Sequence, residues 1–254
     1  MSNVSGVSQA NLYGQLASGV RLRTAADGAS ELGIAEKENI QVTGYEVGNS
    51  NAESGKEVAN ISDAALGGIT DYLKRIRELA LSSMNDATTT ESDRATYQQE
   101  IEQLKQGIAD TAEQTTYNTK RLLDGTYSEF RMATDANGGS AGVTNVNATL
   151  EALGIADFDV TGDFSLDTID KALEKVSGGR SVLGAETNAL EYLQNYNSTA
   201  AYSHTASVSR LEDLDYPQAV EEKKKQETLQ QYALLMQKKK QEDEARKSSM
   251  FWTS

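Results

Sequence analysis

The chain of 254 residues contains no cysteine, one proline and one histidine. Without cysteine, disulfides, thiolate catalysis and the usual structural zinc sites are excluded. The single His204 cannot supply a multi-histidine metal site, and no HExxH motif surrounds it. Because proline breaks helices, its near absence favours long, uninterrupted helices. We therefore expect no metal, no cofactor and no catalytic residue, and composition favours a structural or interaction protein.

Basic residues are also scarce, with 24 Lys and Arg against 38 Asp and Glu, a net charge of -14. Such a chain repels phosphate backbones and anionic lipid, so we expect neither nucleic acid nor membrane as a partner. The apolar runs are too short to span a bilayer. The first residues, MSNVSGVSQANLYGQ, lack the charged start and apolar stretch of a secretory signal. Work outside the cell would require a route without a cleaved leader.

A long apolar stripe runs through the segment from about 27 to 85. Its members are three or four residues apart, which predicts one amphipathic helix with a narrow, coiled-coil-like seam; they are Val58, Ile61, Ala65, Ile69, Leu73, Ile76 and Leu79. Five glycines lower the intrinsic stability of this helix by roughly 1 kcal/mol each relative to alanine. They are Gly44, Gly48, Gly55, Gly67 and Gly68. Neighbouring helices must compensate.

Further along the chain, the pattern predicts three more segments. A second helix, capped near Ser92 and Asp93, follows a polar link at 85–90 and would turn back antiparallel to the first. A small hairpin is expected from Tyr127 onward, with its turn at 135–139. Helical spacing resumes near Ser165, and Pro217 predicts a boundary before a mixed-charge helical tail. The fold class is therefore mainly α: a long antiparallel helical rod, a coiled-coil-like bundle with a small β-hairpin insertion, its N- and C-terminal helices paired.

Several sequence blocks, in order along the chain, resemble the bacterial flagellin family. On the N-terminal side they are LASGVRLRTAADGASELGIAE at 16–36, NISDAALGGI at 60–69, LKRIRELA at 73–80, QEIEQLK at 99–105 and TTYNTKRLLDG at 115–125. On the C-terminal side they are IDKALEKVS at 169–177, RSVLGA at 180–185 and SRLEDLD at 209–215. The family motif residues among them are Leu16, Ser18, Gly19, Arg21, Arg77 and Glu78. The related hook-filament junction proteins have similar terminal regions, but the sequence at 117–125 resembles flagellin more.

The resemblance implies a structural subunit that self-assembles into the bacterial flagellar filament for motility. It further implies export through the flagellar type III system, an extracellular location, and a flagellar export chaperone and a filament cap protein as partners. The resemblance is to a short form without large outer domains. We divide the chain into an N-terminal inner-core segment (1–27), the N-terminal part of the helical rod (28–125), a hairpin and loop insertion (126–164), the C-terminal part of the rod (165–216) and a C-terminal inner-core helix (217–254).

Two features depart from the family pattern. Fewer residues precede the Ser-Gly turn than is usual, so the N-terminal inner helix is expected to be shortened. The C-terminal helix is charged where the family has an apolar stripe. A short seam is still expected between the two ends, in which Val4, Val7, Leu12 and Leu16 would meet Leu229, Leu235 and Met236.

The resemblance also implies recognition by Toll-like receptor 5. By motif position, Arg75, Leu79 and Glu100 are the candidate contacts, while Ser82 stands where strongly recognised members have glutamine. An arginine can act as a planar, multi-donor anchor at an interface. The alternative is that Arg75 and Glu100 serve packing between subunits.

Three other functions remain as alternatives to the filament subunit. One is a hook-filament junction or accessory axial protein, and another is a secreted, non-polymerising ligand of a host receptor. The weakest is an enzyme, for which the paired carboxylates Asp157/Asp159 and Asp213/Asp215 are the only sequence hint. We interpret these carboxylates as solvated surface.

Overall fold

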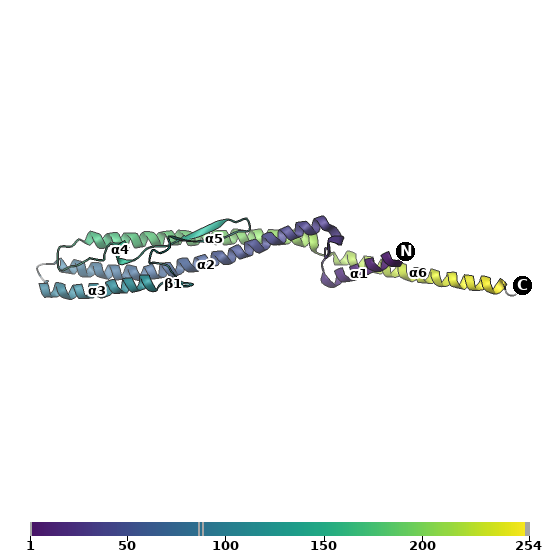
Figure 1. The fold of residues 1–254 in the computed structure, drawn as a ribbon, viewed down its shortest axis with the longest axis horizontal. Helices are drawn as coiled ribbons and strands as arrows, with labels where there is room; N and C mark the ends of the chain where they lie inside the picture. The colour runs from purple at the N-terminus through teal and green to yellow at the C-terminus, as the bar shows by residue number, and fades with distance from the viewer. Residues whose placement is uncertain (1, 86, 88, 252–254) are drawn as a thin grey trace. The chain divides into compact units, whose positions relative to one another are not determined.

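In a computed structural model of the chain, residues 2–85, 87 and 89–251 are described, with side chains described for 10–85, 87 and 89–246. The elements, in order, are α1 (Ser2–Ser18), α2 (Ala25–Ser83), α3 (Glu91–Gln114), β1 (Thr116–Tyr117), β2 (Lys120–Arg121), β3 (Glu129–Ala133), β4 (Ser140–Thr144), α4 (Leu150–Leu153), α5 (Leu166–Glu212) and α6 (Tyr216–Phe251). The predicted mainly helical fold with a small antiparallel hairpin is confirmed (Figure 1).

The chain forms two compact units. One contains residues 41–202, and the other contains the residues up to Ile40 together with those from Ser203 onward. We call them the central unit and the chain-end unit. Helices α2 and α5 contribute residues to both. The predicted divisions at 27/28 and 216/217 lie near the starts of α2 and α6, and the five-part division stays a prediction.

Within the central unit, α2 and α5 run antiparallel. Asn49 of α2 contacts Ser198 of α5, Asp63 contacts Arg180, and Arg77 contacts Asp170. Residue numbers therefore decrease along α5 as they increase along α2. Side chains from α2, α3 and α5 meet in one core, in which Leu66, Ile69, Leu73, Ile76, Ile101, Ile108, Ile169, Leu183 and Leu190 are almost completely buried.

The predicted stripe of α2 is largely confirmed. Val58, Ile69, Leu73, Ile76 and Leu79 are buried. Ile61 is 38% exposed, however, and its neighbour Ser62 is buried instead, at 2% exposed. The reason is the period of 3.6 residues per turn, by which a position offset by one residue points about 100° away.

The cap of α3 lies two residues earlier than predicted. Thr90, not Ser92, is the N-cap residue, and its side chain accepts a hydrogen bond from the backbone N–H of Asp93. The Asp93 carboxylate accepts the Thr90 N–H in return at 2.9 Å, which completes a capping box. The hydrogen bonds that this carboxylate accepts from the Thr90 N–H and hydroxyl lower its pKa.

The predicted hairpin is strands β3 and β4, which pair antiparallel with Phe130 opposite Val143. A second, two-residue hairpin, β1 and β2, was not predicted. Its turn uses Asn118 and Thr119 at φ 46° and 66°, a left-handed conformation that usually signals glycine in a sequence. The short helix α4 was not predicted either.

The β3–β4 hairpin lies directly on the glycines of α2. A Cβ added to Gly44 would be 2.4 Å from the Ala136 Cβ, and one added to Gly48 would be 2.3 Å from the Thr134 carbonyl oxygen. At Gly55 it would meet the Met132 sulfur at 2.5 Å. These three glycines therefore form a flat seat that lets the hairpin approach the helix backbone.

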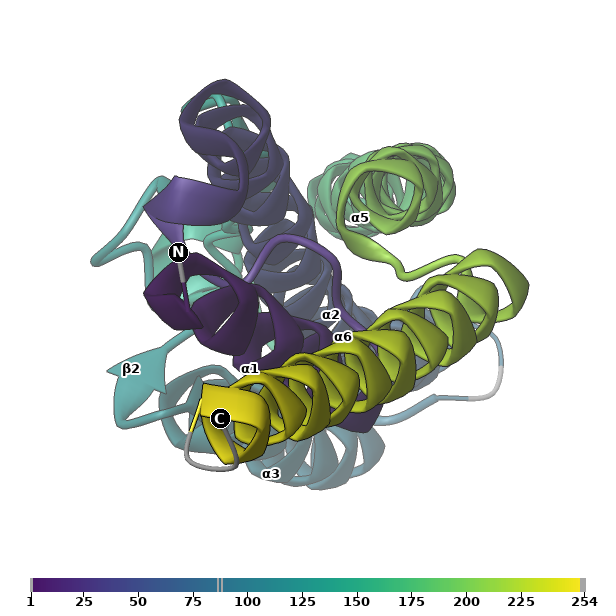
Figure 2. The ribbon, with the colours of Figure 1, turned by 90° about the vertical axis from the view of Figure 1, so that its right-hand side faces the viewer.

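In the chain-end unit, α1 and α6 lie side by side (Figures 1 and 2), so the predicted pairing of the N- and C-terminal helices is confirmed. The Tyr13 hydroxyl contacts Glu227 at 3.1 Å, and the Lys223 amine lies 4.9 Å from the centre of the Tyr13 ring. Ala219 is buried, whereas the larger apolar side chains of α6 between Tyr216 and Met236 are not.

The predicted seam between the chain ends is not formed as expected within one chain. Leu229, Leu235 and Met236 are 60%, 63% and 67% exposed. Leu12 and Leu16 are half-buried, and the side chains of Val4 and Val7 lie outside the described residues. The contact of Tyr13 reaches α6 only at Glu227, and α6 continues well beyond that point.

Candidate functional site: the chain-end clamp and the charged helical face

The connection between α1 and α2 pairs with the connection between α5 and α6. The Arg21 N–H donates to the Glu212 carbonyl at 2.6 Å, and the Leu214 N–H donates to the Gly19 carbonyl at 2.9 Å. The Arg21 guanidinium also donates to the Leu211 carbonyl at 2.7 Å. Gly19 has φ of 72°, a conformation that costs other residues energy. We call this pairing the chain-end clamp.

The other motif residues of this region support the clamp. The Tyr216 hydroxyl donates to the Leu16 carbonyl at 3.0 Å, which ties the end of α1 to the start of α6. The Ser18 hydroxyl donates to the Gln15 carbonyl and accepts the Val20 N–H, both at 3.3 Å. The structure thus brings Leu16, Ser18, Gly19 and Arg21 together where the two chain ends meet.

Asp27 fixes the entry into α2. Its carboxylate accepts hydrogen bonds from the Asn11 amide at 2.6 Å and from the Thr24 N–H and hydroxyl, each at 2.9 Å. These donors, the Asn11 side chain first, lower the pKa of Asp27 to about 2 from an ordinary value of 3.8. Hydrogen bonds to the ionised form favour it.

Acid should therefore loosen this corner of the chain-end unit. Because the folded pKa of Asp27 is depressed, its contribution to stability is complete above pH 3.8 and is lost as the pH falls through about 2. Carboxyl-carbon NMR titration should give a midpoint near 2 for Asp27 in the wild type and a higher midpoint in Asn11→Ala. A wild-type midpoint near 4, unchanged by the substitution, would contradict this arrangement.

A charged face lies on the central unit where α2 and α3 adjoin. The Arg75 Nε donates to Glu100 at 2.7 Å, and a terminal nitrogen of the same guanidinium donates to Glu78 at 3.3 Å. The Arg75 and Glu100 side chains remain 49% and 42% exposed. The hydrogen bond to Glu100 raises the pKa of Arg75 above its ordinary value. The structure thus brings two of the three predicted contact residues together at the surface.

Leu79, the third predicted contact residue, is only 4% exposed and packs in the core. Its side chain offers almost no surface to a partner, so any effect of Leu79 on a contact would act through the position of α2. Ser82 is exposed, and its hydroxyl donates to the Glu78 carbonyl at 2.9 Å. Arg77 faces α5 instead, where its Nε donates to Asp170 at 2.6 Å and lowers the pKa of that carboxyl.

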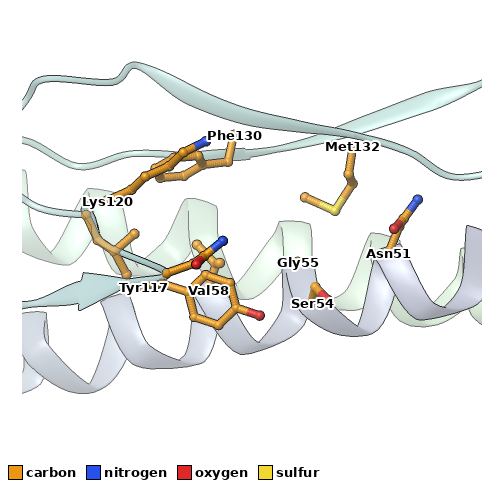
Figure 3. Close-up of a pocket in the computed structure, with 10 residues that line it drawn as sticks. Asn51, Ser54, Gly55, Val58, Tyr117, Lys120, Phe130 and Met132 are labelled. Carbon is orange, nitrogen blue, oxygen red and sulfur yellow. The ribbon is translucent and has the colours of Figure 1, made fainter.

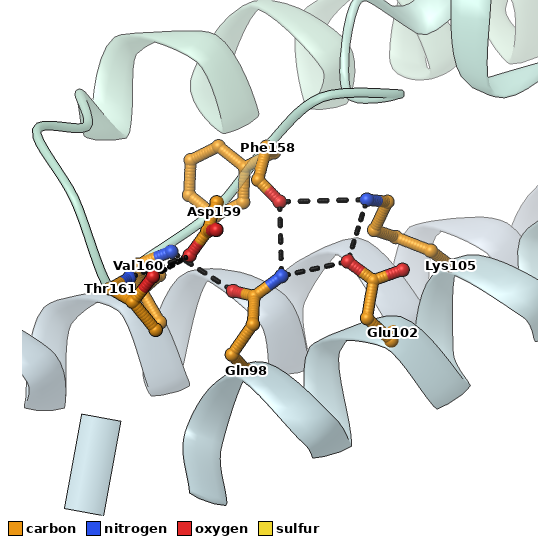
Figure 4. A network of polar contacts seen from close by, with 7 residues as sticks. All are labelled: Gln98, Glu102, Lys105, Phe158, Asp159, Val160 and Thr161. Atoms are coloured by element: carbon orange, nitrogen blue, oxygen red, sulfur yellow. Dashed lines mark hydrogen bonds and ion pairs between the residues drawn. The ribbon is translucent and has the colours of Figure 1, made fainter. Parts of the chain in front are cut away.

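A polar network that sequence reasoning missed holds the loop before α5 onto α3 (Figure 4). The Gln98 amide donates to Glu102 at 2.7 Å and to the Phe158 carbonyl at 3.3 Å, and its oxygen accepts the Val160 N–H at 2.9 Å. The almost fully buried Lys105 side chain donates to Glu102 at 2.9 Å and to the same carbonyl at 3.5 Å. The sequence did carry one signal for this network, because Lys105 lies at a position of the apolar stripe of α3.

Gln98→Ala should destabilise the central unit by about 1–3 kcal/mol, because the Val160 N–H loses its acceptor beside buried apolar groups. Gln103→Ala is the matched control, since Gln103 is exposed on the same helix. Urea denaturation followed by circular dichroism measures both. Equal stability of the two variants would show that the network does not hold the loop.

A small cavity lies where both hairpins approach α2 (Figure 3). Its volume is about 160 Å³, and Gly55, Val58, Tyr117, Phe130 and Met132 are among its lining residues. The amine of Lys120, also in the lining, is 5.5 Å from the Phe130 ring centre, within cation–π range. Gly55 lets the Met132 sulfur approach α2 closely at one side of the cavity, and no Asp, Glu or His is among the lining residues.

Among the described residues, no group of three or more His, Asp or Glu side chains is arranged to hold a metal ion. His204 is instead half-buried, with its Nδ1 2.5 Å from a Glu38 carboxylate oxygen. Within the same described part of the chain, no helix is both long and apolar enough to cross a membrane.

Comparisons with known proteins agree with this architecture. The bacterial flagellin N-terminal helical region matches residues 4–128, and the bacterial flagellin C-terminal helical region matches residues 166–244. A flagellin of Halalkalibacterium halodurans is 33% identical over 215 residues, which cover 82% of this chain and 79% of that protein. The two matched regions include both the chain-end clamp and the charged face.

Two solved structures share the fold. The crystal structure of Bacillus cereus flagellin has a TM-score of 0.52 at 24% identity and covers 58% of this chain and 88% of that chain. A flagellar hook-associated protein of Vibrio parahaemolyticus has a TM-score of 0.57 at 16% identity, with 74% and 98% covered. At these identities the likeness concerns the fold alone, whereas the sequence matches decide the family. The chain belongs to the bacterial flagellin family.

Proposed function

We propose that the chain is a structural subunit of the bacterial flagellar filament and acts through open-ended self-assembly. The observation that carries this proposal is the surface of α6, where five large apolar side chains are each 60–67% exposed: Leu229, Tyr232, Leu234, Leu235 and Met236. Family membership supplies the kind of assembly.

Burial of these side chains would favour association strongly. Each Leu or Met side chain that moves from water into a packed interface contributes about 1.5–3 kcal/mol. Leu229, Tyr232 and Met236 lie on one face of α6, and an exposed apolar patch of this kind marks an interaction site. A second copy is the partner that every subunit would meet, and contacts between two different surfaces of successive copies build a filament rather than a closed ring.

The location and partners follow from the same proposal. The subunit travels unfolded through the flagellar type III export channel, is held beforehand by an export chaperone, and is added beneath a filament cap protein outside the cell. A chain without cysteine and with one proline suits this route, because no disulfide can lock it and few slow prolyl isomerisations delay refolding. We assign it no catalytic role, in keeping with a family of structural proteins.

A hook-filament junction protein is the second candidate, favoured by the shared fold of the hook-associated protein from Vibrio parahaemolyticus. Seeded sedimentation separates the candidates. Purified chain mixed with sonicated fragments of its own polymer should become pelletable without a lag, in proportion to the number of seeds. Short assemblies that stop growing would favour the junction protein, and a chain that stays in the supernatant would favour a non-polymerising ligand.

We further propose that the face formed by Arg75 and Glu100 contacts Toll-like receptor 5 when the chain is monomeric. Its support is the exposed, doubly hydrogen-bonded guanidinium at the motif position. Arg75→Ala should reduce receptor signalling by purified monomer at least tenfold, because an anchoring arginine at an interface is often worth 2 kcal/mol or more. Arg131→Ala, an exposed arginine on β3, is the control. Equal signalling by wild type and Arg75→Ala would remove Arg75 from the contact and leave it a role in packing between subunits.

A further inference from the structure

The outward face of α5 in the central unit is almost free of charge. Between Ser181 and Ser209, only Glu186 and Glu191 are acidic, and Lys and Arg are absent. Exposed residues recur there at spacings of three and four and form what we call the α5 stripe: Val182, Ala185, Ala189, Tyr192, Tyr196 and Thr199. Tyr192 and Tyr196 are 77% and 62% exposed. The stripe lies on average about 140° around the helix from the buried positions Leu183 and Leu190, so it faces mostly away from the core. Tyr196, at its edge, also lies edge-on to the buried Tyr45 of α2, with ring centres 6.3 Å apart.

The uncharged α5 stripe contrasts with the strongly acidic central unit to which it belongs. Residues 41–202 contain 12 Lys and Arg against 25 Asp and Glu, a net charge of -13 out of the chain's -14. Two copies of such a unit repel one another wherever charged faces meet. An uncharged stripe of six helical positions is where a close approach of copies costs least, and tyrosines are favoured as interface anchors.

The complementary surface is found on α2. Exposed residues at the same three-four spacing form the α2 stripe, which contains Thr43, Val47, Ser50, Ser54, Ile61, Ala64 and Gly68. Glu57 interrupts it, but its carboxylate accepts a hydrogen bond from the Tyr117 hydroxyl at 3.0 Å. Val47 and Ile61 are 55% and 38% exposed. Small residues between these apolar ones leave holes of the kind that large side chains fill in a helical seam.

Two other pairings are less suitable. Packing of the α5 stripe on itself would be isologous and would close a dimer, which does not extend a filament. The outward face of α3 carries Glu102, Asp110 and Glu113, so it would repel a unit of the same net charge. The apolar part of α6 belongs to the chain-end unit and is already assigned to the proposed assembly.

We propose that the α5 stripe is an assembly face, with Tyr192 and Tyr196 as its anchors, and that it packs against the α2 stripe of a second copy. This inference rests on the proposed filament function and adds the residues of a contact between neighbouring central units. Because the two stripes are different surfaces, the contact is heterologous and can repeat along an open assembly.

The natural absence of cysteine makes a direct test clean. Two single variants, Ala64→Cys on the α2 stripe and Ala189→Cys on the α5 stripe, are mixed in equal amounts, polymerised and treated with a bismaleimide. A crosslink between positions 64 and 189 then necessarily joins two copies, and peptide mass spectrometry identifies it. The expected result is a strong 64–189 dimer in mixed filaments and little in unpolymerised protein. The control mixture pairs Ala189→Cys with Gln103→Cys on α3.

The outcomes separate this inference from the function on which it rests. If filaments form but the 64–189 crosslink is no stronger than the 103–189 crosslink, the stripe contact is wrong while the filament function stands. If no variant and no wild type forms filaments, the proposed function fails first. As a second measurement, Tyr192→Asp should raise the critical concentration at least tenfold with unchanged thermal unfolding, and Gln103→Glu should not. An equal rise for both would also overturn the stripe contact.

Discussion

Replacement of Gly48 by alanine is expected to destabilise the central unit by about 1–3 kcal/mol, the usual cost of overpacking. The new Cβ would lie 2.3 Å from the Thr134 carbonyl oxygen and 3.0 Å from the Asn197 amide nitrogen. Neither group is free to move, because the buried Asn197 donates to that carbonyl at 2.6 Å and the Thr134 N–H is bonded to Gly139 at 2.9 Å. The clash should outweigh the roughly 1 kcal/mol by which alanine favours a helix.

Gly68→Ala is the matched control and should have the opposite sign. It lies on the same helix, and nothing stands within 4 Å of the added Cβ. We expect a gain of up to about 1 kcal/mol from helix propensity alone. Urea denaturation of both variants, followed by circular dichroism, measures the difference. Stabilisation by both substitutions would mean that the hairpin is not seated on α2 at Gly48.

The double substitution of Leu229 and Met236 by glutamine is expected to abolish polymerisation at concentrations where the wild type assembles. The two side chains are seven residues apart on one face of α6 and are 60% and 67% exposed. Loss of two buried apolar side chains removes about 3 kcal/mol or more from the contact between copies. That change corresponds to a rise of about 100-fold in the critical concentration. Sedimentation at increasing protein concentration measures it.

The monomer should be unaffected by the same change, since exposed side chains contribute little to its fold. Gln231→Ala together with Gln237→Ala, two exposed positions on the same helix, provides the control and should assemble normally. An unchanged critical concentration in the glutamine variant would remove this part of α6 from the assembly surface. A lowered melting temperature of the monomer would show instead that these residues stabilise the single chain.

The features that were predicted correctly from the sequence are those set by the local spacing of apolar and turn residues. The stripes of α2 and α3 follow from side chains that recur every three or four residues, and the turn at 135–139 predicts the hairpin around it. Motif resemblance added what periodicity cannot provide, namely that the Ser-Gly turn and the segment at 209–215 are family motifs, although it did not predict that they pair. In the structure these two segments form the chain-end clamp.

The features that were missed depend on contacts between distant residues. Gly44, Gly48 and Gly55 were interpreted as weak points, and only the position of the β3–β4 hairpin reveals them as a seat. The β1–β2 turn was overlooked because Asn118 and Thr119 adopt a conformation for which glycine is the usual signal. The expected seam at Leu229 failed within one chain because an apolar pattern does not say whether its partner is the same chain or a second copy.

The candidate site was predicted in part. Arg75 and Glu100 are 25 residues apart in the sequence and were placed together by the family motif, and the structure joins them at 2.7 Å. Leu79 was included because it shares that motif, although its place in the apolar stripe already indicated a core position. The place of Lys105 in the apolar stripe of α3 was a signal for a buried polar contact, but its partner could not be identified, since that partner is a backbone carbonyl in a loop without a helical period.

Electron microscopy of the purified chain after salt-induced polymerisation tests the central claim most directly. Salt screens the net charge of -14, and the exposed apolar surface of α6 should then drive copies together. The account predicts long helical filaments, in whose reconstruction α6 of one copy packs against the chain-end unit of another. Persistent monomers, or rings and dimers that do not grow, would contradict it.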